Sequence, residues 1–343
     1  MKRRSRPAFG VVGAPDATAV ARGGVGQAAD GFVPRQGMRT DRATPDPVLD
    51  ACADAARHGD WRAVAAAMPP LDADPDVHHR IVAGVGELAV EDDAWLNAWL
   101  DAAPADANAW CVHAHAMMRL AWRLRTGAPA ADVLPEQWMG FRRVLGQAPA
   151  AAERAVALAP GLATPWIVLM SCAQGLGWEH DRFRAIWAEV SARAPVSVAA
   201  HQRALYYWLP HWQGSAELAT AFVADTSARA RPGSLLTGVR LEYLFLEDGP
   251  GLAEALDAAI ADLAAAPADH PYRILHRHWL AYLLTEAGRH AEAVAEFRAI
   301  DGYAGARPWE LFPDPAGVFC ATRDQAVLGW RRATGPRSPA GGR

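Results

Sequence analysis

The chain has 343 residues, of which 51% are hydrophobic and 21% are charged, and its formal net charge is −4. The length leaves room for one elongated repeat domain or two globular domains, and the apolar fraction is enough for a large core. Residues 1–47 carry eight Lys or Arg against four Asp or Glu, and the last thirteen residues carry four Arg and no acid. The net charge of residues 48–330 is therefore −12. Because an acidic body repels phosphate backbones, we expect no nucleic-acid binding through it.

No run of 18 apolar residues occurs, so the sequence predicts no membrane-spanning helix and no membrane partner. The first residues are basic, but no continuous apolar segment follows them, which argues against a secretory signal. The cysteines, Cys52, Cys111, Cys172 and Cys320, are far apart and form no CxxC pair. Buried free thiols in a reducing compartment are the expectation for such a set, and we predict a cytoplasmic protein.

The two ends of the chain differ in composition from its body. Residues 1–44 show no hydrophobic periodicity and are rich in Gly, Pro, Arg and Ala, so we predict a disordered N-terminal tail. An alternative is that Met38 is the true start of the protein. Residues 45–332 are predicted to form one helical repeat domain with an inserted stretch at about 126–140, and residues 333–343 to form a second disordered tail.

Within the repeat domain, the spacing of apolar residues predicts short helices separated by tight turns. The first pair meets at Gly59-Asp60, and the inserted stretch is expected to be a loop with one turn of helix. Ser215 is placed to cap the helix that follows the turn 210–214. The expected helices are 48–58, 61–68, 77–90, 93–103, 107–125, 141–159, 165–176, 181–194, 198–209, 216–230, 234–247, 252–266, 272–287 and 315–332.

Prolines that would end helices recur along the domain at a nearly constant interval. The gaps between them are 35, 56, 35, 37 and 35 residues. Four of these gaps are close to a period of about 34 residues, and the fifth equals one period plus an insertion of about 22 residues. This spacing indicates an internal repeat. The prolines are Pro69, Pro104, Pro160, Pro195, Pro232 and Pro267.

The segment 279–300 is the clearest copy of the repeat. Two short amphipathic helices meet there at Gly288, where a left-handed backbone carries little steric cost. A pair of this length cannot bury both of its faces alone, so it needs copies on either side. Leu280, Ala281, Gly288, Ala293 and Phe297 occupy the large, small, turn, small and aromatic positions of a known signature, and in these residues the chain resembles the tetratricopeptide repeat (TPR).

The resemblance is specific over roughly 25 residues and looser over about 200 more. It implies an all-α, right-handed solenoid of about six antiparallel helix pairs with disordered ends. It also implies a concave surface that holds a segment of another protein, whose identity the sequence does not indicate. The segment 155–160 is similar to the end of such a repeat, and the turn 210–217 resembles one in bacterial TPR-like proteins of unknown function.

In TPR-like folds one position in each repeat faces the inner groove, and three of the six tyrosines fall at that position. Tyrosine provides rigid contact area and a hydrogen-bonding tip, which suits a recognition surface. We therefore predict an aromatic groove for a peptide or ligand. The alternative is that these tyrosines pack against a neighbouring helix. The predicted groove residues are Asn108, His115, Arg119, Ser171, Gln174, Gln202, Tyr206, Tyr243, Glu247, His278, Tyr282 and Glu286.

The sequence contains no GxSxG, GxxxxGK[ST] or HExxH motif. We therefore predict no catalytic residue, no cofactor and no metal site. His113 and His115 are two residues apart, as are His276 and His278, and such residues differ by about 200° around a helix, so neither pair can share a metal from one helix. The first function hypothesis is a non-catalytic module that holds a peptide or protein segment. Two alternatives stay open: an enzyme of unrecognised type that uses His115, His278 and Glu286, and a structural helical protein that associates with itself.

Overall fold

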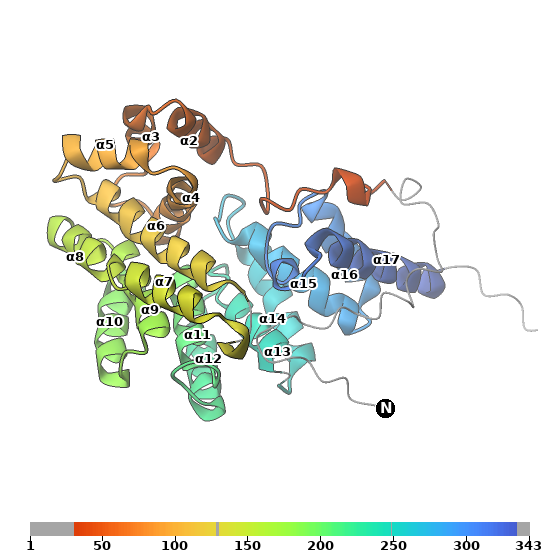
Figure 1. Cartoon of the computed structure of the whole chain (residues 1–343). Coiled ribbons are helices and arrows are strands. Elements are labelled where there is room, and N and C mark those ends of the chain that lie inside the picture. Colours follow the sequence, from red (N-terminus) through yellow and green to blue (C-terminus); the bar gives the residue numbers. More distant parts are fainter. Residues whose placement is uncertain (1–30, 128–129, 248, 335–343) are drawn as a thin grey trace, which may run out of the picture. The chain divides into compact units, whose positions relative to one another are not determined.

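The computed structural model describes residues 31–127, 130–247 and 249–334 (Figure 1). This part is helical, and its β-structure is limited to an isolated bridge, which confirms the predicted all-α class. None of its helices is both long and apolar enough to cross a membrane. It falls into two compact units: residues 46–239, termed the central unit, and residues 31–45 with 240–334, termed the C-terminal unit. The predictions for residues 1–30 and 335–343 lie outside the described residues.

Helices follow one another through short connections in both units. The central unit contains α2 (Pro47–Arg57), α3 (Trp61–Ala67), α4 (Pro75–Glu91), α5 (Ala94–Ala102), α6 (Ala107–Arg125), η3 (Ala130–Asp132), α7 (Pro135–Leu145), α8 (Ala148–Leu158), α9 (Thr164–Leu176), α10 (His180–Arg193), α11 (Val198–Trp208) and α12 (Ala216–Arg229). The C-terminal unit contains η2 (Arg35–Gly37), α14 (Leu252–Ala265), α15 (Arg273–Glu286), α16 (His290–Ile300), η4 (Trp309–Leu311) and α17 (Pro315–Thr334). The chain passes from the central to the C-terminal unit within α13 (Thr237–Glu247).

Polar side chains determine where several helices of the central unit begin. Each accepts a hydrogen bond from a backbone N–H of the first helical turn, which satisfies a donor that has no partner inside the helix. Ser215 caps α12 in this way, with its Oγ 3.2 Å from the nitrogen of Leu218, and the predicted cap is confirmed. The other such caps are Asp46, Asp60, Asp74, Asp106 and Ser197.

The inserted stretch differs from the prediction. A single helix was expected over 141–159, whereas the structure has two, α7 and α8. The break falls at Gly146, a poor helix former, and Pro149 lies in the first turn of α8, where its missing N–H is not needed. The loop expected in 126–140 is shorter than predicted, because α7 already begins at Pro135.

Helix α4 contacts more helices than a linear stack of repeats would allow. It packs against α2, α5 and α6 and also against α9 and α11, which come much later in the chain. In a solenoid each repeat contacts only its neighbours. The start of α4 therefore brings residues of several helices together, and this is where the buried polar groups of the central unit gather.

The C-terminal unit contains the best-matched repeat, and its local features are as predicted. Gly288 has a φ of +75° and joins α15 to α16. Leu280 and Phe297 are fully buried between these helices, with Trp309 and Phe319 completing the core. All four cysteines of the chain are buried and free, as expected.

Residues 31–44 belong to the C-terminal unit, which differs from the predicted tail. The segment lies beside α17 (Figure 1) and forms a parallel bridge between Arg39 and Tyr303. It carries no periodic apolar pattern because backbone hydrogen bonds and a few side chains hold it, not a helical face.

Candidate functional site

The predicted groove residues of the central unit are mostly buried. They lie on α6, α9 and α11, and both α6 and α11 contact α9. Tyr206 is 3% exposed, a value that agrees with the alternative in which this tyrosine packs against a neighbouring helix. Arg119 is partly exposed and forms an ion pair with Glu87 of α4. These residues are Asn108, His115, Arg119, Ser171, Gln174, Gln202 and Tyr206.

The predicted groove residues of the C-terminal unit are also packed in its interior, with exceptions. Tyr282 is 7% exposed and lies edge-on to Phe245 and Trp309, with ring centroids 5.3 and 5.6 Å away. His278 is fully buried, and its Nδ1 accepts a hydrogen bond from the Trp309 indole at 2.7 Å. Glu286 is exposed and Tyr243 and Glu247 are half-buried. The five residues are Tyr243, Glu247, His278, Tyr282 and Glu286.

The first turn of α4 carries two buried polar side chains that reach the starts of three other helices. Asp76 accepts hydrogen bonds from Ser197 Oγ at 2.5 Å and from the first backbone N–H of α11 at 2.8 Å. His78 lies between Asn108 of α6, 2.8 Å from its Nε2, and Thr164 of α9, 2.7 Å from its Nδ1. Burial lowers the pKa of His78, so its ring is neutral. Nε2 faces the carbonyl oxygen of Asn108 and therefore donates, while Nδ1 accepts from the hydroxyl of Thr164. These five residues are termed the α4 tie.

Two further histidines lie next to the α4 tie. The rings of His79 and His115 are 6.0 Å apart, and Nδ1 of each is buried without a hydrogen-bond partner in the described part. Burial lowers the pKa of His79 to about 3, with Arg203 adding to the effect, and holds the pKa of His115 well below its usual value. Gly86 leaves room for this ring, since an added Cβ would lie 2.8 Å from His115 Nδ1. Both rings are therefore neutral at physiological pH.

The α4 tie and its neighbours are suited to joining helices. In the described residues, no group of three or more His, Cys, Asp or Glu side chains is placed to hold a metal ion. The tie was not predicted, because Asp76 and Ser197 are 121 residues apart in the sequence. Its only local signal is the pair His78-His79 just inside a capped helix start.

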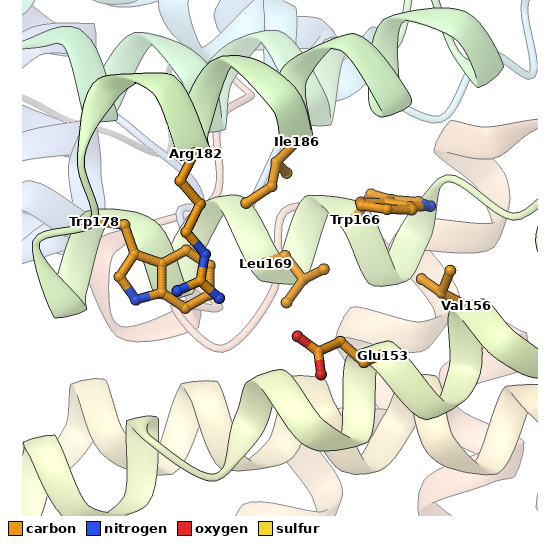
Figure 2. A pocket seen from close by; sticks show the side chains of 7 residues that line it. All are labelled: Glu153, Val156, Trp166, Leu169, Trp178, Arg182 and Ile186. Carbon is orange, nitrogen blue, oxygen red and sulfur yellow. The ribbon is translucent and has the colours of Figure 1, made fainter.

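A cleft of about 250 Å³ opens between α8, α9 and α10 (Figure 2). Figure 2 shows Leu169 near its middle and Trp166 toward one end, while Trp178 and Arg182 stack at the other end. Ile186 of α10 adds apolar surface, so the lining is largely apolar between two aromatic ends.

The two charged groups of the cleft, Arg182 and Glu153, form no ion pair within the described residues. Arg182 is exposed and stacks on Trp178, with its guanidinium carbon 3.3 Å from the ring centroid, and this contact favours one orientation of the side chain. Glu153 of α8 is exposed along the same cleft. Within the described residues, neither Arg182 nor Glu153 forms an ion pair, so both charges are available to a ligand.

Trp166 has an indole N–H without an acceptor in the described part of the chain. Trp110, which stands at the same distance from its repeat's proline, donates to the Pro104 carbonyl at 2.9 Å. The corresponding carbonyl of Pro160 instead accepts from Arg193 Nε at 2.6 Å. The arginine thus takes the acceptor that the sequence repeat would assign to Trp166.

The sequence interpretation placed Trp166 in helix packing and did not single out Glu153, Trp178 or Arg182. A signal was present: Trp178 and Arg182 are four residues apart, directly after Gly177, which ends α9 with a φ of +67°. Trp178 directly precedes the N-cap Glu179 and Arg182 lies in the first turn of α10, so both side chains lie at the start of this helix. Glu153 carries no comparable signal, because it joins the cleft through the packing of α8 on α9.

Comparison with known proteins finds no match: no family model fits the sequence, and no curated protein is similar to it. The class that the structure defines is an all-helical protein of two units.

Proposed function

We propose that the protein is a non-catalytic interaction module that holds a segment of a protein or peptide partner in the cleft between α8, α9 and α10. The observation that supports this function is an apolar cleft that carries one arginine and one glutamate, Arg182 and Glu153, neither of which forms an ion pair within the described residues. An unpaired arginine beside apolar surface is a common element of recognition sites.

The size and lining of the cleft indicate the chemistry of its ligand. Small-molecule sites usually enclose about 300–1,000 Å³, whereas this cleft has about 250 Å³, which suits one or two side chains of a peptide. An apolar side chain would rest on Leu169 and Ile186. An acidic group would face Arg182, and a hydrogen-bond donor would face Glu153. The two charges thereby give the bound segment one direction.

We further propose that the helix pairs are TPR-like repeats, in a stack from which α4 departs by its contacts with α9 and α11, and that the protein is cytoplasmic. Antiparallel pairs such as α9–α10 and α15–α16, each turning at a left-handed glycine, support a TPR-like repeat. A cytoplasmic location is part of the same proposal. It is supported by the four free, buried cysteines.

A peptide selection tests the function. A phage-displayed library is panned against the full chain, and the selected peptides are measured by calorimetry. We expect an apolar residue close to an acidic one, and at least tenfold weaker binding to Arg182→Ala. The matched control is Arg184→Ala on the same helix, which removes an exposed arginine that does not line the cleft. Peptides whose affinity is the same for both variants would contradict the proposal.

Self-association is a second candidate, favoured by one observation. Leu124, Leu134 and Met139 are 38, 59 and 68% exposed, and Gly140 beside Met139 lies against Leu124. Large apolar side chains exposed on one part of a surface often mark an interface. Light scattering after size exclusion would show a dimer that Met139→Lys abolishes, whereas a monomer at all concentrations would remove this candidate.

A further inference from the structure

Residues 32–42 form a segment, termed the strap, that lies on the C-terminal unit and contains the single 3-10 turn η2. Three backbone hydrogen bonds hold it to the turn after α16: Arg39 N–H to Gly302 O at 2.8 Å, Ala304 N–H to Arg39 O at 2.7 Å, and Gly305 N–H to Arg42 O at 3.0 Å. This is how a sheet edge captures an extended peptide, through backbone pairing that does not depend on side chains.

A buried arginine supplies the main side-chain contact. Arg323 of α17 is 1% exposed, and its Nη1 donates to the carbonyl of Val33 at 2.8 Å. Its guanidinium carbon also lies 5.1 Å from the centre of the Phe32 ring. The rest of the guanidinium pairs with Asp324 at 3.3 Å. The strap therefore provides an acceptor for Nη1 and an aromatic face to a cation whose other hydrogen bonds go to Asp324.

Two glycines of the turn make room for the strap. A Cβ added at Gly302 would lie 3.0 Å from a methyl group of Val33. A Cβ added at Gly305 would lie 2.3 Å from the backbone of Arg42. Only glycine permits the strap to approach so closely at these two positions. The turn is thus shaped to receive an extended chain.

The strap contributes one buried side chain to the unit. Phe32 is its buried anchor, at 7% exposed, whereas the Arg35 side chain is 57% exposed in its ion pair with Asp314. Exposed ion pairs of this kind contribute little to binding. The receiving surface, in contrast, is supported by the core of the unit, in which Trp309 and Phe319 are fully buried. Loss of the strap would remove Phe32 but would leave the ring contacts among Phe297, Trp309 and Phe319.

We propose that the turn 302–305, Asp314 and Arg323 form a peptide-binding site, and that the strap is its exchangeable resident ligand. A partner occupies the site when it presents an extended segment with the same chemistry. That chemistry is an aromatic residue followed by an aliphatic one, then an arginine two positions later, as in Phe32-Val33-Pro34-Arg35. The arginine faces Asp314, and the aliphatic residue lies on Gly302 and gives its carbonyl to Arg323.

The geometry explains why the partner must compete. The strap is part of the same chain, so its effective concentration at the site is high and a free peptide is excluded at ordinary concentrations. A partner gains access when the strap is cut or sequestered. The inference is independent of the cleft in the central unit, and Arg182→Ala should leave it unchanged.

The test uses the full chain with a protease recognition sequence inserted between Thr44 and Pro45. A dye-labelled peptide spanning residues 31–43 is added before and after cleavage, and its fluorescence anisotropy is followed. We expect saturable binding to the cleaved protein and at least tenfold weaker binding to the uncut protein. The helical circular dichroism of the cleaved protein should not change when the original strap is displaced.

Peptide variants identify the contacts without altering the fold. Phe32→Ala in the peptide should weaken binding at least tenfold, while Gln36→Ala, at an exposed residue without a hydrogen bond in the described part, should change it less than twofold. On the protein, Gly302→Val should block the peptide. If the cleaved strap stays bound against a hundredfold excess of peptide, or if its release unfolds the unit, the strap is a fixed part of the fold and the proposal is wrong.

Discussion

Replacing Asp76 with asparagine tests whether the α4 tie holds a carboxyl group whose ionisation opposes folding. Asp76 is 5% exposed, and burial raises its pKa to about 6 from an ordinary 3.8, even though Ser197 and the amides of α11 donate to it. Asparagine keeps a similar shape and one acceptor oxygen but cannot ionise. The variant therefore removes the titration and leaves most of the packing in place.

The magnitude and sign follow from the difference in pKa. A shift of about two units corresponds to about 3 kcal/mol. Since the pKa is higher in the folded state, the unfolded chain loses this proton first as the pH rises. The contribution of protonated Asp76 to the free energy of unfolding is complete below about pH 4 and is lost as the pH rises through about 6. Between pH 5 and 7.5 about 1.4 kcal/mol of this change remains to be observed, because the unfolded carboxyl is already mostly ionised at pH 5.

The assay is urea unfolding of both proteins, followed by circular dichroism, at half-unit steps from pH 5 to 7.5. The free energy of unfolding of the wild type should fall by about 1.4 kcal/mol relative to Asp76→Asn across this range. Buried histidines contribute equally to both proteins, so their effect cancels in the difference. Parallel curves, or a difference of opposite sign, would refute the account of Asp76.

Two further predictions concern the neighbours of the α4 tie. The imidazole signals of His79 should not shift in NMR spectra between pH 7.5 and 5, because burial lowers its pKa to about 3. Its folded-state pKa lies below the unfolded-state value, so the associated stability is present above pH 6.5 and is lost on acidification; a midpoint near 6.5 would contradict this. Gly86→Ala should destabilise the protein by about 1 kcal/mol or more in urea unfolding, because the new Cβ would meet His115 at 2.8 Å. The matched control Gly140→Ala, whose Cβ meets Leu124 at 3.6 Å, should instead stabilise by up to about 1 kcal/mol, and equal effects would refute the steric argument.

Features that depend on neighbouring residues could be predicted from the sequence. Gly288 and Ser215 act within one turn of their helices, so a few residues are enough to identify a helix end or a cap. Apolar periodicity likewise predicted the all-α class. The break at Gly146 was missed because apolar residues continue on both sides of it, and the pattern alone does not separate one helix from two.

Features that depend on tertiary packing could not be predicted. Asp76 looks like an ordinary acidic residue in a first helical turn, and only the crossing of α4 over α11 makes it a buried carboxyl group. The groove prediction assumes that every repeat turns the same helix face toward the groove. A small rotation of a helix moves a side chain from that face into the core, and Tyr206 and Tyr282 are buried. The cleft was missed because Arg182 and Glu153 come from helices in different repeats.

The path of the chain has a consequence for biosynthesis. The strap precedes the central unit in the sequence. Arg323, which donates to the carbonyl of Val33, follows that residue by 290 positions. At synthesis rates of about 5–20 residues per second, the strap emerges from the ribosome roughly 15–60 seconds before the surface that binds it. During that interval Phe32 and its neighbours are exposed on the nascent chain, where chaperones can bind them. The C-terminal unit can therefore be completed only after α17 has been synthesised.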